Sequence, residues 1–121
     1  MTMRQSLTVV LERNATLSGT FTTEPYEVAW AAEARWFIRT LQRSAEGVRL
    51  RVRAQVSPDG LHWCDLEEPR DAAGDLESWP SRDFAGWLRL KGTVESADGA
   101  APADGAPGPS AKVLIYLALK S

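Results

Sequence analysis

The chain is poor in the residues that most often build reactive sites, with one cysteine, Cys64, and one histidine, His62, among 121 residues. A single cysteine cannot form a disulfide within the chain, which excludes the cross-linked scaffold of small secreted domains and favours a reducing compartment. A zinc site needs three or four protein ligands. Same-face neighbours on a strand lie about 7 Å apart at Cα, which makes a direct Cys–His nucleophile pair awkward. We therefore expect no metal and no cofactor, and we expect Cys64 to be a small buried residue.

Long apolar runs are also missing. None approaches the roughly 20 residues that a membrane-spanning helix requires. The apolar stretch 7–11 is interrupted by Thr8 and closed by Glu12 and Arg13, which is too short for the core of a signal peptide. We expect no membrane insertion, no signal peptide, and a cytoplasmic or particle-associated location.

Neither sign of charge is in large excess, because 14 basic residues nearly balance 16 acidic ones for a net charge of -2. No overall field attracts nucleic acid or an anionic membrane, so nucleic acid is not the expected partner. The chain has no Gly-rich phosphate loop, GxSxG elbow or HExxH pair. Its carboxylates are concentrated in a polar segment rather than held across a cleft, as glycoside hydrolysis requires. We expect no catalytic residues and no enzyme.

The composition is that of an ordinary globular domain, with 44% hydrophobic and 25% charged residues. Residues 1–121 are therefore expected to form one domain with one core. The clearest pattern has a period of two, which places successive side chains on opposite faces of a strand. It is strongest in residues 48–56, where apolar residues alternate with Arg49, Arg51, Arg53 and Gln55. Residues 57–60, Ser-Pro-Asp-Gly, then predict a tight turn into a return strand over 61–66.

Similar alternation elsewhere raises the expected total to about eight strands. The other predicted strands are 7–11, 16–23, 26–30, 35–41, 84–94 and 112–120. Short strands separated by turn signals predict an all-β fold, an antiparallel two-layer β-sandwich that is jelly-roll-like. A helix over residues 27–42 is the alternative, because several alanines lie there, but the Tyr, Val, Trp, Phe and Ile content favours strand.

Two segments break the alternation. Residues 67–82 are charged and contain Pro69, Gly74 and Pro80, which predicts a long surface loop of the kind that often carries function. Residues 97–110 are rich in Ala, Asp, Gly and Pro and contain no large apolar side chain. Such a segment buries too little surface to offset its ordering entropy, so we expect a flexible loop between the last two strands.

The arginines of the 48–56 strand are candidate binding residues. Arg49, Arg51 and Arg53 should form a stripe on one face that could hold phosphates or an acidic partner. The favoured alternative is that their stems cover the sheet while their charged groups pair across strands. Further arginines and candidate glutamate partners are expected on neighbouring strands, namely Arg35, Arg39, Arg89, Glu12, Glu27 and Glu33.

Five tryptophans are many for this length. Trp36, Trp63 and Trp87 fall in predicted strands and should pack in or against the core. Trp79 lies beside Pro80 in the polar segment 67–82, where an exposed indole would anchor a protein or sugar partner. The equal alternative is that Trp79 folds back and covers the edge of the sandwich.

The middle third of the chain carries a resemblance. Residues 48–66 give a strand, Ser-Pro-Asp-Gly, two residues and a Trp, and residues 86–90 read Gly-Trp-Leu-Arg-Leu. This pattern resembles small β-sandwich proteins of tailed-phage particles and related bacterial assemblies. The resemblance implies a non-enzymatic structural or interaction subunit, homo-oligomeric or part of a larger shell or tail, that binds protein partners.

Two other functions stay open at this point. A carbohydrate-binding module would use surface tryptophans, with Trp30, Trp79 and Trp87 as a platform, because jelly rolls commonly bind sugars, so glycan is a possible ligand. A nucleic-acid-binding protein would use the arginine face, and it predicts steep salt dependence.

Overall fold

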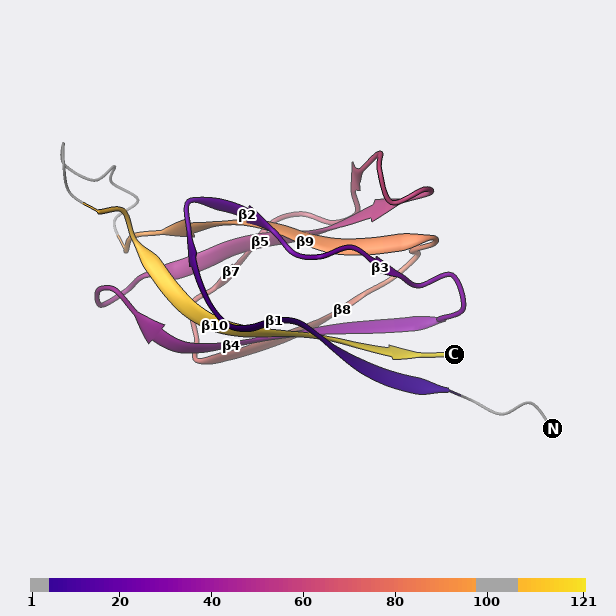
Figure 1. Ribbon diagram of the computed structural model, residues 1–121, viewed down its shortest axis with the longest axis horizontal. Coiled ribbons are helices and arrows are strands. Elements are labelled where there is room, and N and C mark those ends of the chain that lie inside the picture. Colours follow the sequence, from indigo (N-terminus) through magenta and orange to yellow (C-terminus); the bar gives the residue numbers. More distant parts are fainter. Residues whose placement is uncertain (1–4, 98–106) are drawn as a thin grey trace.

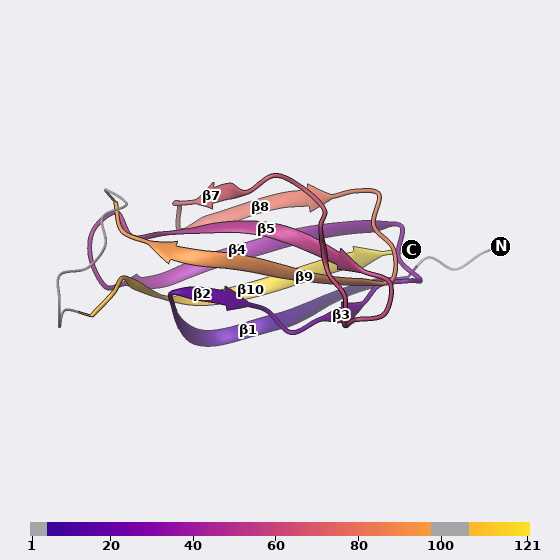
Figure 2. The ribbon, with the colours of Figure 1, turned by 90° about the horizontal axis from the view of Figure 1, so that it is seen from above.

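A computed structural model describes residues 5–97 and 107–121, and their regular structure is entirely β-strand (Figure 1). The strands form two antiparallel sheets that pack face to face and run along the long axis of the molecule (Figure 2). The predicted two-layer β-sandwich is therefore confirmed, and the alternative helix over 27–42 is wrong. Nowhere in the described ranges is there a helix long and apolar enough to cross a membrane.

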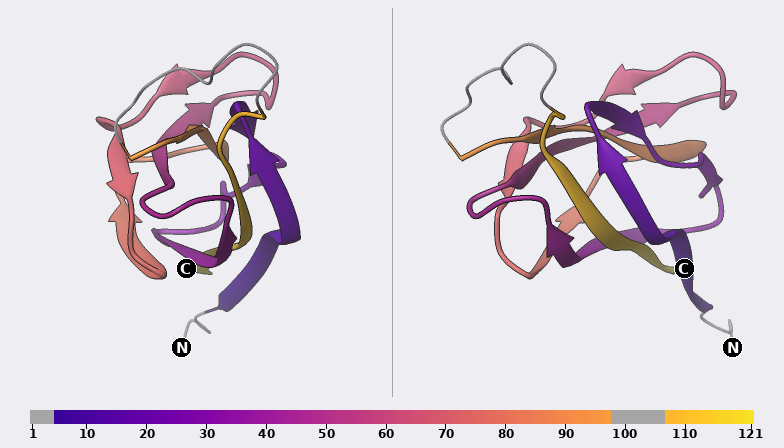
Figure 3. Two further views of the ribbon diagram at one scale, coloured as in Figure 1. Left: turned by 90° about the vertical axis from the view of Figure 1, so that its left-hand side faces the viewer. Right: turned by 60° about the vertical axis from the view of Figure 1, so that its left-hand side comes forward.

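The first sheet, here sheet A, has four strands in the order β1-β10-β4-β8. These are β1 (Ser6–Ser18), β10 (Ser110–Lys120), β4 (Glu33–Arg43) and β8 (Leu76–Ser81). Viewed from its end, the molecule has β1 at one edge of this layer and β8 at the other (Figure 3). The long β1 contains the predicted strand 7–11 and the first part of the predicted strand 16–23, of which residues 20–22 form a separate strand. Register shifts after Val10 and after Glu12 bend β1, and Asn14 adopts a positive φ of 50° there.

The second sheet, sheet B, is built around the long pair β5 (Arg49–Ser57) and β9 (Trp87–Glu95). Two short strands, β2 (Thr20–Thr22) and β3 (Tyr26–Glu27), both pair with β9. Two others, β6 (Cys64–Asp65) and β7 (Arg70–Ala72), both pair with β5. Each short pair therefore occupies the place of one interrupted strand. The pairing is nested along the chain, with β1 on β10, β2 and β3 on β9, β4 on β8, and β5 on β6 and β7.

The core lies between the sheets and follows from the alternation. In β10 every second residue is buried, and Val113, Ile115 and Leu117 are fully so. Alternate residues of β4, including Trp36, lie beside these side chains in sheet A. Alternate residues of β5 and β9, including Leu50, face them from sheet B. Burial of this apolar surface is the main favourable term in folding.

The segment 67–82 is not a long loop. It contains β7 and β8, and β8 alternates between outward Leu76, Ser78 and Pro80 and inward Trp79 and Ser81. Proline is tolerated because β8 is an edge strand that pairs only with β4. The prolines and glycine suggested a loop, whereas tertiary packing of the inward residues makes the segment a strand.

Other boundaries also differ from expectation. The predicted strand 26–30 is regular only at residues 26–27, and the predicted strand 61–66 only at residues 64–65. Cys64 is exposed, not buried, because this short edge strand pairs with the end of β5 and nothing covers it. Of the predicted flexible segment 97–110, residues 98–106 lie outside the described residues.

Candidate interaction surfaces

The arginine stripe lies on the outer face of sheet B, and each of its members has a carboxylate partner. Arg51 Nη1 is 2.8 Å from Asp71 Oδ1, and Arg53 Nη1 is 2.6 Å from Asp65 Oδ2. Arg49 Nη2 is 3.5 Å from Glu95 Oε2, and Arg49 Nε, 3.9 Å from Asp71 Oδ2, is beyond hydrogen-bond distance.

The favoured alternative of cross-strand pairing therefore holds, but the predicted partners were wrong. Asp65, Asp71 and Glu95 come from the strands that flank β5. The predicted partner Glu33 lies on β4 in sheet A, remote from the stripe. Arg35 and Arg39 are also on β4, so only Arg89, on β9, neighbours the stripe. Partner binding through these arginines stays a prediction, and it would require their ion pairs to exchange.

The stripe continues into a hydrogen-bonded network towards the end of β5. Gln55 donates to Asp65 Oδ1 over 2.9 Å, and Arg89 Nε donates to Gln55 Oε1 over 2.8 Å. The guanidinium of Arg89 also stacks 4.2 Å from the ring centre of Trp63. The hydrogen bond from Gln55, followed by the charge and hydrogen bond of Arg53, lowers the pKa of Asp65. The β5 arginines on the outer face of sheet B are thus paired with carboxylates of the same chain, although Arg49 Nε has no hydrogen-bond partner among the described residues.

Trp79 is a core residue, and the prediction of an exposed anchor is wrong. Its side chain is 3% exposed and stacks on Trp36, with ring centres 6.5 Å apart. The guanidinium of Arg70 also lies over the Trp79 ring, 4.6 Å from its centre, and the indole Nε1 donates to Glu67 Oε1 over 2.7 Å. Trp79 therefore closes the edge of the sandwich. Trp79 is therefore not accessible to form the predicted sugar-binding platform with Trp30 and Trp87.

Glu67 joins this edge to the rest of the core. Its Oε2 accepts a 3.1 Å hydrogen bond from the Ser81 hydroxyl, which itself accepts one of 2.8 Å from Trp36 Nε1. One carboxylate therefore takes hydrogen bonds from two side chains of β8. This pattern satisfies the polar atoms that would otherwise be buried without partners.

The outer face of sheet A carries a group of mostly apolar side chains. Its central row runs across the sheet as Val10, Tyr116, Phe37 and Ser78, in register. Four apolar side chains flank this row on the same side of the sheet, namely Leu76, Pro80, Leu114 and Ala118. We call these four and the central row the outer apolar face. All eight side chains are half-buried or exposed.

This face lacks the cross-links of sheet B. Its two arginines are Arg35, which donates to the Ser78 hydroxyl over 3.0 Å, and Arg39, which has no side-chain partner within the described ranges. The sequence does indicate an apolar outer face here, because residues 113–119 are apolar at every position. A strand with one face in water should alternate, whereas an unbroken run indicates cover on both faces.

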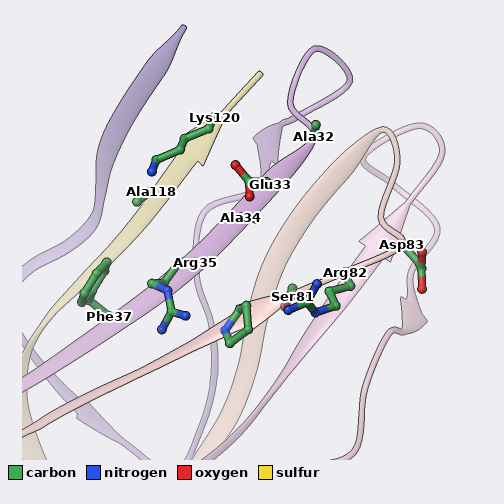
Figure 4. A pocket seen from close by; sticks show the side chains of 11 residues that line it. Ala32, Glu33, Ala34, Arg35, Phe37, Ser81, Arg82, Asp83, Ala118 and Lys120 are labelled. Carbon is green, nitrogen blue, oxygen red and sulfur yellow. The ribbon is translucent and has the colours of Figure 1, made fainter. Parts of the chain in front are cut away.

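A hollow of about 510 Å³ lies at one end of the outer apolar face (Figure 4). Apolar side chains from β4, β8 and β10 form much of its lining, namely Ala34, Phe37, Pro80 and Ala118. Its charged lining residues are Glu33, Arg35, Arg82, Asp83 and Lys120. The hollow therefore combines an apolar lining with three cationic and two acidic side chains.

The turn that follows β5 is as predicted for Ser-Pro-Asp-Gly and is held by side-chain hydrogen bonds. Asp59 Oδ1 accepts from the backbone N–H groups of Leu61 and His62 at 2.8 and 2.9 Å, and Asp59 Oδ2 is 2.7 Å from His62 Nδ1. Ser57 Oγ accepts from Gly60 N at 2.8 Å. The bonds from His62, backbone first, hold the pKa of Asp59 well below its usual range. Gly60 has a φ of 79°, which suits glycine.

Together the sheets define an all-β sandwich domain with one ion-paired and one apolar outer face. No family model matches the chain, and no curated protein matches it. A chain in the structure of infectious bursal disease virus Gx strain superimposes with a TM-score of 0.55 at 16% identity, covering 97% of this chain and 32% of that one. This chain thus spans about a third of that chain's length, and the likeness is one of fold.

A second solved structure, the crystal structure of FLHE, superimposes with a TM-score of 0.40 at 14% identity, covering 98% of this chain and 95% of that chain.

Proposed function

We propose that this chain is a non-enzymatic structural subunit that packs against copies of itself within a larger protein assembly, such as a phage-particle-like shell or tail. The observation that carries the proposal is the outer apolar face of sheet A. Phe37, Leu114 and Tyr116 lie there half-buried, with part of each side chain accessible to solvent. Contiguous apolar surface of this kind marks protein interaction sites in folded domains.

The fold supports the same proposal. The nested pairing of the strands in two facing sheets supports a jelly-roll-like arrangement, in which two Greek keys form the two sheets. Viral capsid domains use this architecture, as do lectins and cupins. The fold likeness to a chain of infectious bursal disease virus agrees with an assembly subunit. Because fold does not fix function, the surface must carry the argument.

The energetics also favour contact through sheet A. Each Å² of apolar surface removed from water contributes about 25 cal/mol. Contact at the outer face of sheet B would have to remove water from ion pairs such as Arg51–Asp71 and Arg53–Asp65, and desolvating charges opposes association. Sheet A presents fewer such groups, so it is the favoured contact surface.

Light scattering coupled to size exclusion tests the proposal. We expect the wild-type protein to exceed its monomer mass of 13.3 kDa, with a mass that rises with concentration. Tyr116→Glu places a charge in the central row of the outer apolar face and should return the protein to a monomer. Thr93→Glu places the same charge on the outer face of sheet B and should not. Far-ultraviolet circular dichroism verifies that both variants fold.

A wild-type protein that stays at 13.3 kDa at every concentration would contradict the proposal. If that monomer also changed its tryptophan fluorescence on addition of glycans, the carbohydrate-binding alternative would replace it. Equal association of wild type, Tyr116→Glu and Thr93→Glu would show that the outer apolar face is not the contact.

A further inference from the structure

The turn over residues 57–64 displays an apolar side chain on a fixed frame. Leu61 is 78% exposed, the most exposed of the large hydrophobic residues in the described ranges. The backbone N–H of Leu61 donates to Asp59 Oδ1. The neighbouring Gly60 lies against the ring of Trp87, where a Cβ on residue 60 would be 3.3 Å from that ring. A side chain whose backbone is already ordered loses less entropy on binding. Leu61 therefore has the features of an anchor for a partner's pocket.

The turn and the sheet A hollow lie on opposite sides of the sandwich. The segment that follows β5 stands out beyond sheet B, away from sheet A (Figure 1). The hollow is lined by β4, β8 and β10, the strands of sheet A (Figure 4). One copy can therefore place its turn against the hollow of the next, stacked in the same direction. Such a contact joins two different surfaces and propagates into a ring or a filament.

The chemistry of the two surfaces is complementary. The hollow offers Phe37 and Ala118 as apolar contacts for a leucine side chain. Its three cationic side chains outnumber its two carboxylates. The tip of the turn carries a single carboxylate, that of Asp59, which accepts hydrogen bonds from backbone N–H groups and lies 2.7 Å from Nδ1 of the exposed His62. Opposite charges at the rim of an apolar contact fix register and orientation.

We propose that the 57–64 turn of one copy docks into the sheet A hollow of a second copy, with Leu61 against Phe37 and Ala118. Asp59 then faces Arg35 and Lys120. This inference rests on the proposed function, because it names the partner and the part of that partner which covers one end of the outer apolar face. It adds a direction to the assembly, since each copy has one turn and one hollow.

The chain's single cysteine permits a direct test. Cys64 is exposed beside the turn, and the chain has three lysines, of which Lys120 lines the hollow whereas Lys91 lies on sheet B and Lys112 at the other end of β10. A short thiol-to-amine cross-linker is applied to a mixture of ¹⁵N-labelled and unlabelled protein. Mass spectrometry should find Cys64–Lys120 links between labelled and unlabelled chains. Links between chains that join Cys64 only to Lys91 or Lys112 would overturn the inference, and so would the absence of any links between chains.

A matched pair of variants gives a second test. Leu61→Ser removes the anchor from an exposed position and should lower the association constant at least tenfold. Leu61→Met keeps an apolar side chain of similar size and should associate as the wild type does. Because Leu61 is exposed, both variants should keep the wild-type unfolding transition.

The outcomes separate this inference from the proposed function. Monomeric wild-type protein contradicts both. An oligomer that Tyr116→Glu dissociates but Leu61→Ser leaves intact contradicts only the turn-in-hollow contact, and the outer apolar face then has another occupant.

Discussion

The outer faces of the two sheets satisfy their side chains in different ways. On sheet B the arginines of β5 meet carboxylates from both flanking sides, and Arg51–Asp71 and Arg53–Asp65 are hydrogen-bonded at 2.8 and 2.6 Å. On sheet A the corresponding positions hold Phe37 and Tyr116, and its Arg39 has no side-chain partner in the described part of the chain. The β5 arginines of sheet B are ion-paired within one chain, whereas we propose that the outer face of sheet A is covered by a second copy.

Each sheet also has a tryptophan that is covered by an arginine. Trp79 of sheet A faces inward, where it contacts both Arg70 and Trp36. Trp63 lies outside sheet B, half-buried under Arg89. The same pair of residue types therefore builds core on one side of the molecule and surface on the other. We therefore expect the contribution of each pair to stability to depend on its burial more than on its residue types.

The largest expected effect comes from removing these rings. Trp79→Ala should lower the free energy of unfolding by about 3–5 kcal/mol, the usual range for a buried aromatic truncation. Trp63→Ala should lower it by about 1 kcal/mol, because an exposed cation–π contact contributes little. Urea unfolding followed by far-ultraviolet circular dichroism measures both.

Trp79→Phe is the control for the role of the indole N–H. It keeps an apolar ring on Trp36 but leaves Glu67 without one of its two donors, so the loss should be about 1–3 kcal/mol. Equal losses for Trp79→Ala and Trp63→Ala would show that the inward tryptophan is no more important than the outward one.

Acid should affect the two sheets in opposite directions. Burial, aided by the charge of Glu24, raises the pKa of Glu12 on β1 of sheet A above 4.5. Asp65 of sheet B has its pKa lowered below 3.8. A lowered pKa adds stability above the unfolded value that is lost as the pH falls through the folded one. A raised pKa removes stability at neutral pH, and that loss disappears as Glu12 becomes protonated.

Two amide variants test these signs by urea unfolding at about pH 7 and about pH 3. At neutral pH Asp65→Asn should lower the free energy of unfolding and Glu12→Gln should raise it. Both differences from wild type should shrink at the lower pH, where the carboxylates gain protons. The same sign for both variants at neutral pH would refute the contrast.

The fold could be predicted from the sequence where one side chain in two is apolar. Residues 48–56 alternate without a break, and β5 occupies 49–57. Prediction failed at β8, where Pro80 and the surrounding charges resemble a loop. Its strand depends on pairing with β4, some 40 residues earlier in the chain, and on Trp79 packing against Trp36. Such long-range packing overrides local preference.

The candidate surfaces were less predictable for the same reason. The arginine stripe follows from local alternation. Its partner Asp65 lies on β6, within the predicted strand 61–66, whereas Asp71 lies on β7, in the segment predicted to be a loop. The hollow collects residues from β4, β8 and β10. No single segment of the sequence contains the hollow. Only the unbroken apolar run 113–119 indicates that the outer face of this sheet is apolar.

The smallest expected effect is the one that isolates the ion pairs. Arg51→Ala breaks its pair with Asp71, in which the side chains are 45% and 47% exposed. It should lower the free energy of unfolding by about 0.2–1 kcal/mol, and the loss should fade in about 1 M salt, which screens exposed charges. Arg39→Ala is the matched change on sheet A and has no ion pair to lose, so its unfolding should match wild type at either salt concentration. If Arg39→Ala proved as costly and as salt-sensitive as Arg51→Ala, the two outer faces would not differ in the way the structure indicates.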